Sequence, residues 1–84
     1  MSKITVRYFA SIREAVGQGS EAVETAATTL GALRDELIAR GGSYAASLAR
    51  GRAVRMALNQ TLSDESATLA DGAEVAFFPP VTGG

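Results

Sequence analysis

The stretch TTLGALRDELIARGG, residues 28–42, decides the fold class. Its apolar residues recur at i, i+3, i+7 and i+8, the spacing that gives one apolar stripe on a helix: Leu30, Leu33, Leu37 and Ile38. Thr29 is a suitable N-cap, and Gly41 and Gly42 supply the left-handed stop that helix ends favour. The stretch therefore predicts one amphipathic helix of roughly three turns, packed on a sheet.

Alternating apolar residues on both sides of this helix predict β-strands. In residues 3–9, Ile4, Val6 and Tyr8 alternate with their neighbours in the period of two that marks a half-buried strand. The other predicted strands are a weaker return strand at 21–27, a third strand at 53–62 broken at Asn59-Gln60, and a last strand at 74–78. The first two are expected to form a hairpin with a long connection.

The remaining segments are expected to connect these elements. Residues 11–21 predict a loop, and residues 43–50 predict a single extra helical turn. A short strand near residues 62–69 is a weaker prediction, and Asp71-Gly72 marks a tight turn before the last strand. A ferredoxin-like fold needs a second full helix, so the chain favours an α+β fold in which one main helix packs across a mixed sheet.

Composition narrows the function. The 84 residues include no cysteine and no histidine, which excludes disulfides, thiolate zinc sites and Cys/His nucleophile pairs, and we expect no metal. The net charge is -1 and Lys3 is the single lysine, so the dense positive charge that binds nucleic acid or anionic membranes is missing. The first residues lack the apolar run of a signal peptide or membrane span, so we expect one cytoplasmic domain.

Two phenylalanines break the inside-outside pattern of the strands. If Ile4, Val6 and Tyr8 enter the core, Phe9 points away from the helix. Adjacent residues of a strand face opposite sides, so Phe77 and Phe78 cannot both be buried in a regular strand. If the first and last strands are neighbours, Phe9 and Phe78 form an apolar patch, a common feature of partner surfaces. Sheet curvature or the short helix covering one or both rings is the alternative.

The last six residues have the composition of an extended arm. Pro79 and Pro80 cannot donate to a strand ladder and favour extended geometry. Gly83 and Gly84 carry no side chain, so a narrow channel can close around the backbone and a reagent can approach the last carbonyl. A carboxylate resists nucleophilic attack, so acyl chemistry at Gly84 first requires activation, for example as an acyl-adenylate.

Three stretches together resemble a known family across essentially the whole chain. They are ITVRYFASIREAVG at 4–17, ALNQTL at 57–62 and DGAEVAFFPPVTGG at 71–84, of which the last is the most specific. They are similar to the MoaD-type sulfur carriers, the small subunits of molybdopterin synthase. The resemblance implies a ubiquitin-like β-grasp domain at residues 1–78, with adjacent first and last strands at the sheet centre, and an extended diglycine tail at residues 79–84.

The resemblance also implies a partner surface and a reaction. The implied partner-binding residues are Phe9, Leu62, Phe78, Pro79 and Pro80, and the tail that inserts into the large synthase subunit is Val81, Thr82 and Gly83, ending at Gly84. An E1-like enzyme would use ATP to adenylate Gly84, and a sulfur donor protein would convert it to a thiocarboxylate. The sulfur would then pass to cyclic pyranopterin monophosphate in molybdenum cofactor biosynthesis.

The same resemblance implies an assembly of two large and two small chains. The pterin-binding and acid/base residues would belong to the large subunit, and this chain would bind no cofactor itself. Whether it counts as an enzyme on its own stays open.

Other interpretations stay open at this point. The chain could carry sulfur for thiamine thiazole synthesis or tRNA thiolation, modify proteins as ubiquitin does, or dock its tail without chemistry. Arg13 and Glu14 match a frequent pair of the family, although a solvated loop contact is favoured. Residues Arg50, Arg52 and Arg55 form a basic cluster in the sequence, for which a solubilising surface is favoured over a contact with the activating enzyme.

Overall fold

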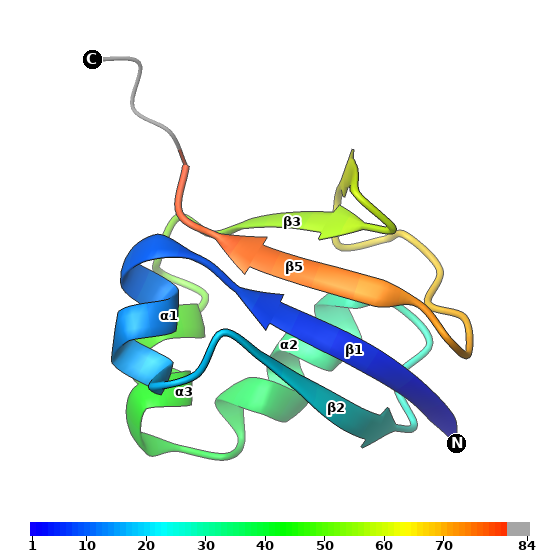
Figure 1. Cartoon of the computed structure of the whole chain (residues 1–84), viewed down its shortest axis with the longest axis horizontal. Helices are drawn as coiled ribbons and strands as arrows, with labels where there is room; N and C mark the ends of the chain where they lie inside the picture. The colour runs from blue at the N-terminus through cyan, green and yellow to red at the C-terminus, as the bar shows by residue number, and fades with distance from the viewer. Residues whose placement is uncertain (81–84) are drawn as a thin grey trace.

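The computed structural model describes residues 1–80, which contain five strands and three helices (Figure 1). In chain order these are β1 (Ser2–Tyr8), α1 (Ala10–Val16), β2 (Ser20–Thr25), α2 (Leu30–Ile38), α3 (Gly42–Leu48), β3 (Arg55–Leu58), β4 (Thr61–Ser63) and β5 (Glu74–Phe78). The strands form one sheet in the order β2-β1-β5-β3-β4. In Figure 1 the sheet faces the viewer, and α2 and α3 lie behind it.

The sheet is mixed because its two central neighbours, β1 and β5, run parallel, while every other pairing is antiparallel. In this parallel pair Val6 lies beside Val75, and Tyr8 lies beside Phe77. The expected α+β architecture, with a mixed β-grasp sheet and one main helix across it, is therefore confirmed.

The main helix, α2, forms where the leucine spacing predicts it. Leu30, Leu33 and Leu37 are buried, and the Thr29 hydroxyl accepts a hydrogen bond from the Ala32 backbone N–H at 3.2 Å, so the predicted N-cap is confirmed. Ala39 ends the helix in a right-handed conformation, and Gly41, whose positive φ of 76° suits glycine, turns the chain into α3. Each helix has at most nine residues, so no helix within residues 1–80 could cross a bilayer.

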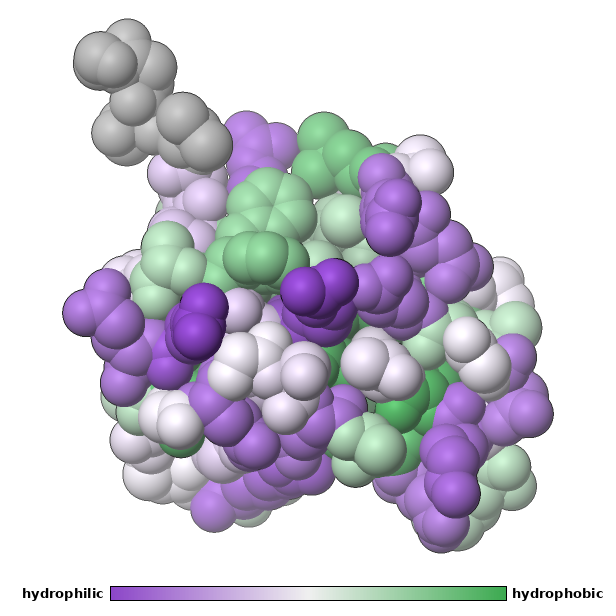
Figure 2. All heavy atoms as spheres, in the orientation of Figure 1, coloured by the Kyte–Doolittle hydropathy of each residue, from purple (hydrophilic) through white to green (hydrophobic). Residues whose placement is uncertain are grey.

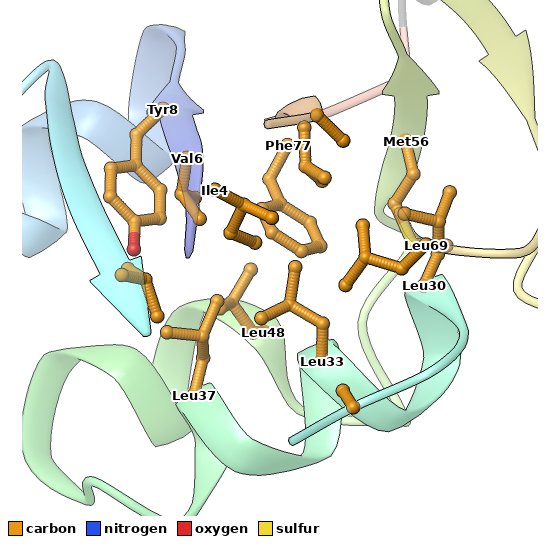
Figure 3. Close-up of a cluster of buried hydrophobic side chains, with 14 of the residues drawn as sticks. Ile4, Val6, Tyr8, Leu30, Leu33, Leu37, Leu48, Met56, Leu69 and Phe77 are labelled. Atoms are coloured by element: carbon orange, nitrogen blue, oxygen red, sulfur yellow. The ribbon is translucent and has the colours of Figure 1, made fainter. Parts of the chain in front are cut away.

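The core fills the space between the sheet and α2 (Figure 3). Ile4, Val6 and Tyr8 of β1 point toward the helix with Phe77 of β5, and all four are almost completely buried. Leu48 of α3 closes the same cluster. The alternation predicted for the first strand therefore gives the correct inner face.

Two predictions between the strands and helices need correction. The predicted loop at residues 11–21 is wrong, because α1 occupies most of it: Ile12 is buried in the core, and Gly17 caps the helix in the left-handed conformation. The predicted single turn at 43–50 is longer, since α3 begins directly at Gly42. Packing against the core stabilises two helices that are too short to form alone.

The predicted strand at 53–62 is two strands. Asn59 and Gln60 both have positive φ, 50° and 70°, which makes a two-residue hairpin turn between β3 and β4. The short strand expected near 62–69 is thus confirmed only at its start, where β4 pairs with β3. Farther along, Thr68 makes one isolated bridge to Thr29, and the last strand has the predicted bounds.

A buried arginine holds the loop after α3 against α2. Arg34 is 4% exposed, and its guanidinium donates to the backbone oxygens of Leu48, Ala49 and Arg52 and to the Glu65 carboxylate. Burial is the main cause that lowers the pKa of Arg34, and four hydrogen bonds engage all three nitrogens of the guanidinium. The helix pattern did not predict this inward charge.

A second polar group lies at the carboxyl end of β1. The Tyr8 hydroxyl donates to Glu21 at 2.7 Å, the Tyr44 hydroxyl donates to the same carboxylate at 2.9 Å, and Arg40 contacts both of its oxygens at 3.0 Å. Burial raises the pKa of Tyr8, and the Glu21 hydrogen bond raises it further. Burial also acts to raise the pKa of Glu21, but hydrogen bonds from Tyr8, Arg40 and Tyr44, together with the Arg40 charge, outweigh burial and lower that pKa.

This group predicts a component of acid unfolding. Because the pKa of Glu21 is lower in the folded chain than its ordinary value of 4.5, the carboxylate stabilises the fold fully above that pH. This stabilisation is lost as the pH falls through the lowered pKa. We expect Glu21→Gln to reduce the free energy of unfolding near neutral pH, with the gap to the unmutated chain narrowing below pH 4.5, as measured by urea denaturation.

Glu24→Gln is the matched control, since Glu24 lies on the same strand with an exposed side chain. It should follow the unmutated chain throughout. A gap between Glu21→Gln and the unmutated chain that stays constant through the acid range would contradict the role given to the carboxylate.

Candidate functional site

The candidate site lies on the face of the sheet that points away from α2. Phe9 follows β1 in extended conformation and is 40% exposed, while Phe77 is fully buried and Phe78 is half-buried on the opposite side of β5. The expected placement is therefore confirmed: Phe77 faces the core, and Phe9 and Phe78 lie on the other face of the sheet. The Phe9 N–H also donates to the Phe77 carbonyl at 3.1 Å, which continues the β1–β5 pairing by one residue.

Strand register brings Leu62 to the same face. Ala57 of β3 lies opposite both Leu62 of β4 and Ala76 of β5, and directly opposed residues of neighbouring strands share a face. Leu62 is 62% exposed. Together we call these residues the outer-face patch: Phe9, Ala57, Leu62, Ala76 and Phe78. Figure 2 shows an apolar area on this face, near the carboxyl end of β5, with hydrophilic surface around it.

Arg7 supports the aromatic part of this patch. Its guanidinium carbon lies 5.5 Å from the centre of the Phe9 ring, and Nη1 donates to the Glu74 carboxylate at 3.2 Å. Both contacts hold the arginine across the outer face of β1 and β5. The ion pair is half exposed and contributes little to stability, so its effect is to orient the guanidinium beside the ring.

The outer-face patch is hollowed rather than flat. A depression of about 470 Å³ is lined by Arg7, Phe9, Ala57, Gln60, Glu74, Ala76 and Phe78. The lining contains one ion pair, one amide and four apolar side chains, with no nucleophile and no acid/base pair. Within residues 1–80, no three potential metal-ligating side chains come together. The side chains of this surface offer mainly apolar area and one ion pair.

Only the first part of the predicted arm lies within the described residues. Pro79 and Pro80 follow β5 directly and are half-buried, so the predicted arm begins beside Phe78 and the outer-face patch. The predicted tail residues Val81, Thr82, Gly83 and Gly84 lie outside the described residues. The structure thus places Phe9, Leu62 and Phe78 on the outer face, and the two prolines follow Phe78 directly in the chain.

Two of the arginines that are close in sequence have different surroundings, Arg50 and Arg55. Arg50 is bound to the carboxylates of Asp35, at 2.9 Å, and Glu65, so it joins α2 to the loop after β4. Arg55 lies opposite Phe78 and belongs to the outer face instead. Both acidic partners of Arg50 are distant from it in sequence, and the solubilising role expected for the three arginines stays a prediction.

The predicted loop contact of Arg13 is consistent with its position. A Cβ atom placed on Gly19 would lie 3.3 Å from Nε of Arg13, so the side chain covers the glycine between α1 and β2. Glu14 is exposed. The Arg13 backbone N–H donates to the Phe9 carbonyl at 3.3 Å, so the first turn of α1 is tied to the aromatic end of the outer-face patch.

Comparison with known proteins identifies the family. The ThiS family model matches residues 6–84. The chain belongs to the ThiS family. Among its relatives is the molybdopterin synthase sulfur carrier subunit of Escherichia coli strain K12, which is 44% identical over 81 residues, covering 96% of this chain and 99% of that protein. The resemblance inferred from the three sequence stretches is therefore confirmed.

Two solved structures extend this comparison. The small archaeal modifier protein 1 of Haloferax volcanii is 21% identical, covers 96% of this chain and 100% of its own, and has a TM-score of 0.77, which shows the shared fold alone. A complex of subunits 1 and 2 of molybdopterin-converting factor from Helicobacter pylori 26695 contains a chain that is 27% identical, with a TM-score of 0.66. That match covers 98% of this ThiS-family chain and 99% of the other.

The two adjacent phenylalanines of β5 give a direct test of the face assignment. Phe77→Ala should lower the free energy of unfolding by about 3–5 kcal/mol, since it empties a fully buried site where the ring stacks near Tyr8. Phe78→Ala should cost about 1 kcal/mol, because its ring is already half solvated. Urea denaturation of both variants measures the difference. Equal losses would mean that Phe78 is a core residue.

Proposed function

We propose that this chain is the sulfur carrier and small subunit of molybdopterin synthase. The observation that carries the proposal is the position of the outer-face patch: it lies beside the last residue of β5, where two prolines begin the arm that leads to Gly83-Gly84. A binding surface and a reactive end are thereby joined in one short segment. The family match through residue 84 and the name of the Escherichia coli relative support it.

The proposed chemistry takes place at the Gly84 carboxylate. One carboxylate oxygen attacks the α-phosphorus of ATP, which forms the acyl-adenylate and releases pyrophosphate. Hydrosulfide, or the terminal sulfur of a persulfide whose S–S bond a thiol then cleaves, attacks the acyl carbon, and AMP leaves with the oxygen. The product is a thiocarboxylate, whose sulfur is then donated to cyclic pyranopterin monophosphate in molybdenum cofactor biosynthesis.

Three partners follow from this scheme. An E1-like enzyme supplies the adenylation site and ATP, a sulfur donor protein supplies the sulfur, and the large synthase subunit binds the pterin substrate. The Helicobacter pylori complex of subunits 1 and 2 supports the large-subunit partner. In our proposal two large and two small chains form the synthase in the cytoplasm, and Phe9, Leu62, Phe78, Pro79 and Pro80 contact the large subunit.

The proposed division of labour suits the side chains of this chain. The outer-face patch offers apolar area and one ion pair, which bind a protein surface but do not catalyse. Insertion of Val81, Thr82 and Gly83 brings Gly84 to a pterin held by the partner. Glycine at the last two positions lets the partner's channel close around the backbone.

The decisive experiment adds one alanine after Gly84. The extended chain should keep its fold and its affinity for the large subunit within a few-fold, because the outer-face patch is unchanged. It should lose sulfur transfer completely, since the activated carboxyl group is displaced from its required position. Activating enzyme, ATP, a sulfur source and large subunit are supplied, and intact mass reports the exchange of one oxygen for one sulfur.

Phe78→Ser is the matched control for this experiment. It leaves Gly84 in place, so the thiocarboxylate should still form, whereas binding to the large subunit should weaken about tenfold or more because an aromatic anchor is lost. Sulfur transfer by the extended chain would overturn the proposal. Isopeptide ladders in the cellular pool would instead indicate a ubiquitin-like modifier, and exclusive co-purification with a thiazole synthase or a tRNA-thiolating enzyme would indicate another sulfur pathway.

A further inference from the structure

We infer that the depression in the outer-face patch is a socket for one large apolar side chain of the synthase large subunit. The inference rests on the proposed function and deepens it, because it adds the shape and chemistry of the contact. Phe9 and Phe78 would then form a wall of the socket in addition to contacting the partner surface directly. The argument depends on what forms the floor, what forms the rim and what holds the partner there.

Two alanines form the floor. Ala57 and Ala76 lie opposite each other on the adjacent strands β3 and β5, and both are half-buried on the outer face. Any larger side chain at either position would rise into the depression, since strand side chains stand perpendicular to the sheet. The hollow therefore exists because two small residues meet between Arg7 on one side of the row and Leu62 on the other.

The walls come from the two neighbouring rows of the sheet. On the side toward the carboxyl end of β5, Phe9 and Phe78 rise beside the alanines, and on the other side are Glu74 and Gln60. The Glu74 carboxylate is already bound to Arg7, and Arg7 already lies against the Phe9 ring. Since the charged groups of the rim satisfy each other, the depression favours an apolar occupant over a charged one.

The large subunit is the source of that occupant because, in the proposed function, it is the partner that binds the inserted arm. Phe78 is both a wall of the depression and the residue directly before Pro79, so a partner that holds the arm must lie over or beside the hollow. If the bound partner left the depression empty, the side chains that line it would lose van der Waals contacts. Water would fill it poorly, because its floor offers only methyl groups and paired backbone.

Filling the floor tests the inference. Ala76→Val adds two methyl groups to the depression and leaves Phe9, Phe78 and the arm in place. Because valine suits a central strand and this side chain lies on the outer face, the melting temperature should stay equal or rise slightly. Affinity for the large subunit, measured by titration calorimetry with full-length chains, should fall about tenfold or more. Ala57→Val should act in the same direction.

Ala22→Val is the matched control. Ala22 lies on the same outer face, on the edge strand β2, where it pairs with Thr5 of β1. It does not line the depression. It should bind the large subunit as the unmutated chain does. Binding by both Ala76→Val and Ala57→Val at the unmutated affinity would overturn the socket, because a partner that only covers the patch tolerates a raised floor.

The same measurements separate this inference from the proposed function. If the unmutated chain binds the large subunit and transfers sulfur while the filled variants bind normally, the socket fails and the proposed function stands. If the unmutated chain neither binds the large subunit nor transfers sulfur, the proposed function fails and the socket fails with it. Weak binding by the filled variants, with intact thiocarboxylate formation and an unaffected Ala22→Val, supports both.

Discussion

The parallel pairing of β1 with β5 is the constraint on which the rest of this structure depends. It places two distant segments side by side at the centre of the sheet, with Val6 beside Val75 and Tyr8 beside Phe77 on the face that α2 covers. Once that face is buried, the next residue of each strand must point outward. Phe9 and Phe78 therefore become neighbours on the opposite face, and one hydrogen-bonding register sets both the core and the candidate binding surface.

Much of this arrangement can be predicted from the sequence, since periodicity carries it directly. The period of two in residues 3–9 and the leucine spacing of residues 30–38 specify which side chains face the core. Two adjacent phenylalanines in one short strand then require that one ring faces outward. Only the adjacency of the first and last strands had to come from the family resemblance. The alternation of apolar and polar residues predicts which face a side chain occupies but not the order of strands in the sheet.

The parts that could not be predicted depend on contacts between distant residues. Helix α1 has two glycines after it and a single buried side chain, Ile12, so its sequence looks like a loop until the core is present. The inward position of Arg34 depends on carbonyl groups that the loop after α3 brings to it. The depression was missed for a related reason: Ala57 and Ala76 are unremarkable singly and form a floor only when β3 and β5 pair. The sequence did contain one indication of the depression: Ala76, a small residue, lies on the same face of its strand as the outward Phe78.

The central pairing also orders the events of folding. The Lys3 backbone N–H donates to the Asp71 carboxylate across 68 positions of the chain, and β5 must be present before β1 has its inner neighbour. Such high contact order slows folding and delays it until nearly the whole domain has left the ribosome. A nascent chain that stops short of β5 has neither a closed core nor an outer-face patch. In the proposed scheme, an incomplete chain therefore could not occupy the large subunit without delivering sulfur.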